Sequence, residues 1–193
     1  MPIPSFYQEE QENHRVREVT RTIVDVVAAL CLAAMVGIFL CGRAQVNGRA
    51  MEPLLASGDE VLIDRLTYAF TEPQRLDIVY FETTDSSGNS RRLIRRIIGM
   101  PGEHVQIVNG RVKINGENLV LSGGLDRAVL AGLAEHEIIL DDDEYFVMGD
   151  NRDNSEDSRF ESIGNMKRKE LTGKVWIRIA PFARFGFLKE ETP

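Results

Sequence analysis

The segment EYFVMGDNRDNSEDSR, residues 144–159, joins a short apolar run to a loop crowded with charge. The run from Tyr145 to Met148 has the aromatic and β-branched composition of a buried strand. Positions 150–159 then carry six charged side chains, among asparagine and serine side chains of the kind that bond backbone groups in turns. We expect a strand that ends in a loop whose shape is held by its own ion pairs.

Two other interpretations of this loop are a solvated surface turn and a calcium-binding loop. With Asp150 as the first ligand, Glu161 would be the twelfth residue of an EF-hand loop. Arg152 then stands at the third position, where a ligand is needed, and Ser155 stands where the turn requires glycine. The residues therefore argue against calcium, and we expect neither a metal nor a cofactor.

The chain has 193 residues, with 23 basic and 30 acidic side chains and a net charge of -7. Its length suits one domain of about 150 residues plus an accessory segment. The acidic residues are spread along the chain, so we expect no nucleic acid partner. Cys31 and Cys41 would lie about 15 Å apart on a helix, which is too far for a disulfide.

Beyond Gly42, most runs alternate apolar and polar residues or are rich in β-branched side chains, as strands are. They are VLI at 61–63, DIVYF at 77–81, RLIRRII at 92–98, HVQIVNG at 104–110, RVKING at 111–116, EYFVM at 144–148 and KVWIRI at 174–179. Asn109-Gly110 and Asn115-Gly116 are typical of tight hairpin turns. We expect a mostly β, antiparallel domain, in which residues 125–135 are the one modest helical candidate.

The string GDNRDNSEDSR closely resembles the last signature box of type I signal peptidases, membrane-bound serine proteases that cut signal peptides from exported proteins. Further resemblances are AMEPLLASGDEVLIDRL at 50–66, RLDIVYF at 75–81, LIRRIIGMPGEHV at 93–105 and TGKVWIRIAPFARFGFL at 172–188. Together they extend from about residue 46 to the end of the chain, so the chain is identified as a member of that family. The resemblance implies a catalytic-type β domain, with residues 104–143 as a smaller inserted cap subdomain.

An apolar run near the N-terminus predicts a membrane anchor. Residues 26–41 carry no polar side chain except two thiols, and extension back to Ile23 adds only Asp25, giving a helix of about 28 Å. A buried core helix would need a polar face, and a cleavable signal would not have so long a leader with mixed charges. We expect a cytoplasmic tail at 1–22, a transmembrane helix at 23–41 and an extracytoplasmic domain at 42–193, in the cell membrane. The outward orientation is implied by the family, and Asp25 is expected to reach the headgroups.

The resemblance places the chemistry and shows that it has changed. In the family a serine just before Met-x-Pro attacks the scissile carbonyl, and a neutral lysine removes its proton. In this chain Gly48, Arg49 and Ala50 precede Met51, so Ala50 occupies the nucleophile position. A methyl group has no lone pair with which to attack.

The lysine of the family belongs to a strand whose frame is matched here by Ile94, Arg96, Gly99, Pro101 and Gly102. Arg95 stands at the position of the general base. A guanidinium stays protonated and has no acceptor lone pair, so it does not act as a base.

A third departure is Gly48, where the family uses a serine hydroxyl to help hold the oxyanion. Loss of one such donor costs roughly 3 kcal/mol in comparable sites. His104 and Ser57 are the residues that come nearest to a substitute pair, and we expect a solvated strand end for the first and a turn for the second. We expect no replacement dyad.

The supporting residues match the family more closely. Ser155 matches the residue that orients the catalytic lysine, and Asp150, Asp157 and Arg159 match a structural ion-pair set. Residues 160–163, Phe-Glu-Ser-Ile, depart from the aromatic-tryptophan-glycine continuation of the family. The walls of a peptide groove are expected at 46–50 and 93–95, with peptide-binding side chains from Val46, Met51, Leu93 and Ile94.

Two functions remain open. The first is a signal peptidase-like membrane protein that no longer cuts, and binds exported preproteins or pilin-like surface-polymer subunits as a chaperone or assembly factor. The alternative is an active type I signal peptidase in which Ala50 is an engineered replacement of the serine. A conformational variant of the first has Arg95 close the empty site by pairing with a carboxylate such as Asp157. The expected partners are an exported polypeptide and the lipid bilayer, which the three phenylalanines of PFARFGFL, residues 181–188, either contact or leave to pack the last strand.

Overall fold

The computed structural model describes residues 5–84, 88–121, 125 and 127–188, without the side chains of residues 5–15, 34, 36 and 38–40. The chain forms two compact units, Met1–Leu40 and Cys41–Pro193. The first consists of one α-helix, α1, at Ser5–Leu40. In the part of the chain that the structure describes, no helix is long and apolar enough to cross a membrane. The anchor at 23–41 stays a prediction, and it includes positions whose side chains lie outside this description.

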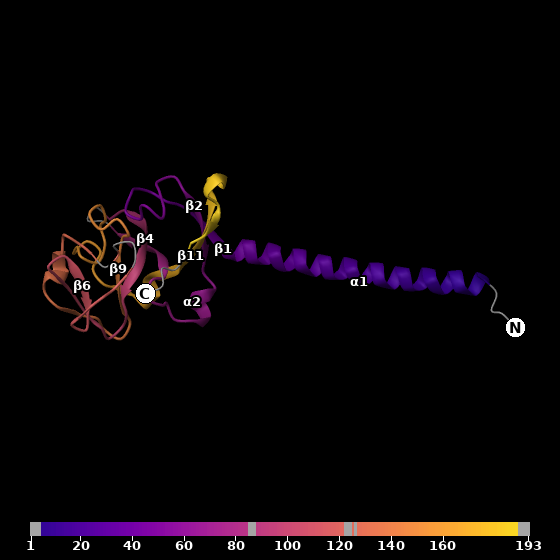
Figure 1. Ribbon diagram of the computed structural model, residues 1–193, viewed down its shortest axis with the longest axis horizontal. Coiled ribbons are helices and arrows are strands. Elements are labelled where there is room, and N and C mark those ends of the chain that lie inside the picture. The colour runs from indigo at the N-terminus through magenta and orange to yellow at the C-terminus, as the bar shows by residue number, and fades with distance from the viewer. Residues whose placement is uncertain (1–4, 85–87, 122–124, 126, 189–193) are drawn as a thin grey trace. The chain divides into compact units, whose positions relative to one another are not determined.

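The second unit is built on a large antiparallel sheet (Figure 1). Its strands are β1 (Cys41–Gln45), β2 (Glu60–Asp64), β3 (Ile78–Thr84), β4 (Ser90–Gly99), β9 (Glu144–Met148), β10 (Met166–Lys167), β11 (Leu171–Ala180) and β12 (Gly186–Phe187). They follow the order β1-β2-β11-β3-β4-β9-β10, and β12 pairs with β11. Every pair is antiparallel, so the mostly β, antiparallel fold expected from the sequence is confirmed.

Residues 104–139 contribute a second, smaller sheet. It contains β5 (His104–Val108), β6 (Arg111–Ile114), β7 (Glu117–Asn118) and β8 (Ile138–Ile139), in the order β7-β6-β5-β8. The turns between β5 and β6 and between β6 and β7 have positive φ at Asn109 (51°), Gly110 (71°), Asn115 (52°) and Gly116 (82°). These are the dihedrals that a type I′ hairpin needs, which explains why Asn-Gly occurs twice here.

Buried apolar side chains form clusters on both sheets. One cluster joins the small sheet to the large one, because Val105, Ile107 and Val112 pack with Phe146 and Met148. A second cluster lies under the first strands of the large sheet and includes Val46, Met51, Val61, Ile78 and Ile94. The core therefore fixes the loop after β1 and the middle of β4 relative to each other.

The helical candidate at 125–135 was only partly right. Its last four residues form the 3-10 helix η2, Gly132–Glu135, and Ala131 precedes it without a side-chain cap. The N–H of Leu133 donates to the carbonyl of Arg159, so this stretch is held by the charged loop and not by its own helical periodicity.

The sequence did not predict the short helix α2, Thr67–Phe70. Asp64 holds the turn that leads into it, because the carboxylate accepts hydrogen bonds from the N–H groups of Leu66 and Thr67 and from the Thr67 hydroxyl. The C-terminal phenylalanines were expected mainly to pack the last strand. Instead Phe182, Phe185 and Phe187 stay largely exposed, at 86, 54 and 70 %, although the Phe187 ring lies 5.6 Å from that of Trp176.

Candidate functional site

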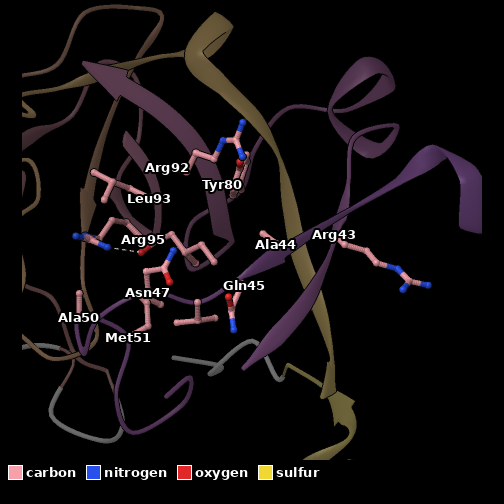
Figure 2. Close-up of a pocket in the computed structure, with 12 residues that line it drawn as sticks. Arg43, Ala44, Gln45, Asn47, Ala50, Met51, Tyr80, Arg92, Leu93 and Arg95 are labelled. Carbon is pink, nitrogen blue, oxygen red and sulfur yellow. Dashed lines mark hydrogen bonds between the residues drawn. The ribbon is translucent and has the colours of Figure 1, made fainter. Parts of the chain in front are cut away.

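A groove lies between the loop that follows β1 and the middle of β4 (Figure 2). Its volume is about 200 Å³. It is lined by Arg43, Ala44, Gln45, Val46, Asn47, Ala50, Met51, Tyr80, Arg92, Leu93, Ile94 and Arg95. The structure thus brings the four expected peptide-binding residues together with Ala50 and Arg95. Gly48, Ser155 and the expected ion-pair residues do not line the groove.

The turn that carries Ala50 is held by backbone contacts. The N–H of Val46 donates to the carbonyl of Asp59 at 2.8 Å, and the N–H of Gly58 donates back to the carbonyl of Val46 at 2.9 Å. Gly48 has φ of 81°, a conformation that suits glycine better than the serine expected in the family. The side chain of Met51 is buried in the core, so Ala50 is fixed one residue from a buried anchor.

Asp59 is a positioning residue that the sequence analysis missed. Its carboxylate is fully buried and accepts from the N–H of Ala56 at 3.0 Å. Arg184 forms an ion pair with it, and Arg178 lies 3.5 Å away and also donates to the carbonyl of Leu54. In the sequence, Asp59 follows Ser57-Gly58 directly before the VLI strand, and this position was the available signal for a buried carboxylate. A buried carboxylate needs cationic partners, which Arg178 and Arg184 provide.

The charged loop presses against the Ala50 turn through Gly149. The N–H of Asn151 donates to the carbonyl of Ala50 at 2.9 Å. A Cβ at Gly149 would lie 2.5 Å from that same carbonyl oxygen and would overlap the hydroxyl of Ser155. Glycine is therefore required at 149 by close packing, and the loop and the turn share one contact surface.

Arg95 reaches from β4 into the charged loop. Its Nε and one terminal nitrogen donate to the carbonyl of Glu156 at 2.8 and 2.6 Å, and the other terminal nitrogen donates to the carbonyl of Ile94 at 2.7 Å. The side chain does not pair with Asp157, contrary to the conformational variant considered above, because that carboxylate is occupied by Arg159 and by the N–H of Gly149.

Burial lowers the pKa of Arg95 to about 10, and the carboxylates of Asp157 and Glu156 oppose that shift. The guanidinium is thus protonated at neutral pH. A protonated guanidinium offers only donors, so Arg95 has no means of accepting a proton from a neighbouring group.

Ser155 lies behind the groove, next to Gly149. Its hydroxyl oxygen is buried and has no hydrogen-bond partner among the described residues. Arg95 does not hydrogen-bond to this hydroxyl and donates instead to the carbonyl of the next residue, Glu156. The position that orients a lysine in the family therefore contacts no side-chain nitrogen of Arg95 within hydrogen-bond distance.

The loop at 150–159 is held by two buried ion pairs. Arg159 and Asp157 form one, at 2.8 Å between Nε and a carboxylate oxygen, and both side chains are fully buried. Arg96 and Asp150 form the other through two contacts of 2.7 Å. The loop was predicted to pair only with itself, but Asp150 pairs with Arg96, which comes from β4. The Arg-Arg dipeptide within an apolar strand was the signal, since a buried cation needs a carboxylate.

The two remaining chemical candidates lie elsewhere. His104 begins β5, with its side chain 42 % exposed and 3.3 Å from Glu137. Ser57 is exposed in the turn before Asp59. Neither lines the groove, in agreement with the solvated strand end and the turn that the sequence predicted.

The antiparallel sheet thus carries a groove lined by Ala50 and Arg95, beside a loop that is held by buried ion pairs. A family model described as "Signal peptidase, peptidase S26" matches residues 19–180, so the chain belongs to the signal peptidase family, peptidase S26.

Two relatives, similar in sequence over most of the chain, agree with this assignment. The chain is 33 % identical over 172 residues to the probable signal peptidase I-2 of Synechocystis, covering 86 % of this chain and 75 % of that one. It is 30 % identical over 164 residues to signal peptidase I of Bacillus amyloliquefaciens, covering 81 % and 85 %. A crystal structure of a signal peptidase I from Enterococcus faecalis shares 30 % identity, covers 54 % of this chain and 97 % of that one, and gives a TM-score of 0.39.

The family expected from the motifs is confirmed. The comparisons do not support a non-catalytic chaperone role. The names of the relatives favour the alternative, ordinary signal peptidase activity.

Proposed function

We propose that the groove binds an extended segment of an exported preprotein as an added β-strand and, with the side chains present in this chain, does not cut it. One observation carries the binding half of this proposal. β1 ends the large sheet, and positions 91–95 of β4 pair with β3 on one side, while pairing with β9 begins only at Arg96. Both strand edges border the same groove, so an extended peptide between them would find backbone donors and acceptors on either side.

The lining supports a peptide with small or apolar side chains. Val46, Met51 and Ile94 are buried and present carbon atoms to the groove, while Gln45 and Asn47 contribute amide groups. Strand addition takes its affinity from the main chain and its specificity from such alternate side-chain pockets.

The chemistry supports binding without cleavage. Ala50 has no oxygen to attack a carbonyl, and Arg95 has no lone pair to activate one. The loss of a nucleophile and its base as a unit costs on the order of a millionfold in other serine hydrolases. On these residues a bound segment would be released intact.

We further propose that this takes place at the cell membrane, with residues 1–22 in the cytoplasm, 23–41 as the anchor and 42–193 outside. The apolar run at 23–41 and the family both support this arrangement. The ligand is then a translocated polypeptide, either a preprotein or a pilin-like subunit, and the role is that of a chaperone or assembly factor.

Binding is tested with a labelled peptide of about eight residues, long enough to pair along one strand. The full-length protein in mild detergent should bind it. N-methylation of either alternate set of backbone amides should abolish binding, because one set would face β1 and the other would face β4. The matched control is the unmethylated peptide, and binding of both methylated peptides as tightly as this control would exclude strand addition.

Cleavage is tested by incubating the same protein with a preprotein and following the mature product. The expected result is no product above a buffer control. Turnover clearly above that control would refute the non-catalytic half of the proposal and leave the groove assignment standing.

The second candidate is an active type I signal peptidase, and the specific observation in its favour is the set of names borne by the relatives. It requires the natural protein to carry serine at position 50. A serine codon in the native gene would support this candidate, although Arg95 and Gly48 would still need explanation. An alanine codon would eliminate it in this form.

A further inference from the structure

The groove ends at a buried cation that has no carboxylate hydrogen-bonded to it. Arg95 is 6 % exposed, and its three hydrogen bonds all go to carbonyl oxygens. A guanidinium has five N–H groups, so two remain for a ligand. The adjacent carboxylates are engaged, since Glu156 pairs with Arg91 and Asp157 pairs with Arg159.

The backbone beside this cation also offers a donor. The N–H of Ala50 has no acceptor in the described part of the chain, while its carbonyl is taken by Asn151. Figure 2 shows Ala50 and Arg95 at the same end of the groove, whereas Arg43 points away at the opposite end. No aspartate or glutamate is among the residues that line the groove. This end therefore presents positive charge and N–H groups, and the two adjacent carboxylates, Glu156 and Asp157, are each paired with another arginine.

A chain that continued from this end towards the charged loop would meet the side chain of Arg95. That side chain leaves β4 at the same end of the groove as Ala50 and is tied to the carbonyl of Glu156 in the charged loop. A peptide that ran on in that direction would have to displace the side chain from its carbonyl partner. A peptide that stopped there would place its terminus against it.

We propose that this end of the groove binds the free C-terminal carboxylate of an apolar peptide, held by the Arg95 guanidinium and the Ala50 N–H. The ligand is thus a chain that ends at Ala50, such as the product of a peptide-bond hydrolysis carried out by another protein. This inference rests on the proposed peptide groove and names the kind of peptide that it takes. The interaction is a charge-assisted hydrogen bond, which is stronger than a contact with a neutral amide.

The experiment compares four forms of one labelled apolar peptide on the full-length protein in mild detergent. They are the free acid, the C-terminal amide, the amide with glutamate as its last residue, and the acid extended past the terminus by a few residues. Fluorescence anisotropy should show the free acid binding about tenfold or more tightly than each of the other three, a difference of about 1.4 kcal/mol. Equal binding of acid and amide would overturn the inference while leaving the groove in place.

Three other outcomes would also overturn either the inference or the proposed function. Tighter binding of the extended peptide would show that the chain runs through, and equal binding of the glutamate amide would show that any carboxylate suffices; each overturns the inference. If no form binds, the proposed function itself fails. These comparisons use the unaltered protein, so they do not depend on the folding of a variant.

Two variants then locate the carboxylate. Arg95→Gln should reduce the ratio of acid to amide affinity from about tenfold to near one. The matched control is Arg92→Gln, which removes an arginine from the same groove but one that is exposed and paired with Glu82. It should leave the ratio unchanged. A ratio that survives Arg95→Gln, or that is lost equally in Arg92→Gln, would refute the assignment to Arg95.

Discussion

The charged loop and the groove end both bury a guanidinium, and they satisfy it in opposite ways. Arg159 faces the carboxylate of Asp157 with both side chains fully buried, so that cation is neutralised where it stands. Arg95 is bonded to carbonyl oxygens alone, and burial lowers its pKa to about 10. The first region is closed on itself and serves as a frame, whereas the second places a cation without a hydrogen-bonded carboxylate at a groove. The difference teaches that a buried guanidinium can belong to a closed frame or to a binding surface, depending on whether a carboxylate or a carbonyl accepts its hydrogen bonds.

The most severe test of this contrast introduces the serine and lysine side chains that the family resemblance predicts at these positions. Gly48→Ser, Ala50→Ser and Arg95→Lys together should raise preprotein cleavage from background by up to about a millionfold, because nucleophile and base act as a unit. Ala50→Ser alone should raise preprotein cleavage very little, since Arg95 does not accept the proton of the serine hydroxyl. Product formation on a preprotein is the measurement, with Arg92→Lys as a control that adds a lysine elsewhere in the groove. Failure of the triple variant, if it still folds, would mean that the groove has diverged as well.

A second test compares the two cations by stability. Asp157→Asn leaves Arg159 buried without its carboxylate and should lower the free energy of unfolding by about 3 to 5 kcal/mol. Arg95→Met removes a buried charge along with its own desolvation cost and should change stability much less. Urea unfolding in mild detergent measures both. Equal losses would contradict the distinction between frame and groove.

A third test addresses the contact between the two regions. Gly149→Ala would place a methyl group against the Ala50 carbonyl and the Ser155 hydroxyl, which should destabilise the protein by about 1 to 3 kcal/mol. Gly164→Ala is the control, because its φ of 65° imposes backbone strain without a close neighbour. Thermal unfolding should show the larger loss for position 149 if packing is the cause.

The loop should also lose stability in acid. Hydrogen bonds from Arg91 and Ser162 lower the pKa of Glu156 below its ordinary value of 4.5. A carboxyl with a depressed folded pKa stabilises the fold above its unfolded pKa and loses that contribution as the pH falls through the folded value. Unfolding followed between neutral pH and the acid range should therefore show a loss that is smaller in Glu156→Gln. An identical pH dependence in the variant would show that Glu156 contributes nothing.

The smallest expected effect concerns the exposed pair at the groove mouth. The side chains of Arg92 and Glu82 are 70 and 50 % exposed, so Arg92→Ala should change stability by no more than about 1 kcal/mol. Urea unfolding with and without added salt is the check. A large, salt-sensitive loss would place Arg92 in the frame and weaken its use as a groove control.

Local pattern was enough to predict much of the fold. The alternating runs gave the strands, and the Asn-Gly dipeptides gave both hairpins of the small sheet, because type I′ turns select residues that tolerate positive φ. The order of the strands in the large sheet did not follow, since β11 inserts between β2 and β3 from more than 80 residues away along the chain. Helix α2 was not predicted, because its four residues are too few to show a periodic pattern and the turn before it is held by the Asp64 carboxylate.

The sequence indicated which residues would line the groove, but it did not indicate the hydrogen-bond partners of the two arginines next to it, Arg95 and Arg96. Val46, Met51, Leu93 and Ile94 line the groove with Ala50 and Arg95, as the motifs implied. The hydrogen-bond partner of Arg95 was not predictable, because it is the backbone carbonyl of Glu156, and every residue type has such a carbonyl. The bond between Arg96 and Asp150 likewise depends on strand register, which brings Arg96 opposite Met148 at the start of the loop.

The open edge of β1 has a consequence for the purified protein. The opposite end of the large sheet is blunt, since β10 contributes only Met166 and Lys167, while β1 offers five residues. A strand of that length with one edge unpaired in the described part of the chain is a template for pairing with any second chain, including another copy of itself. We expect self-association of the empty protein at high concentration, and its suppression by a peptide that fills the groove.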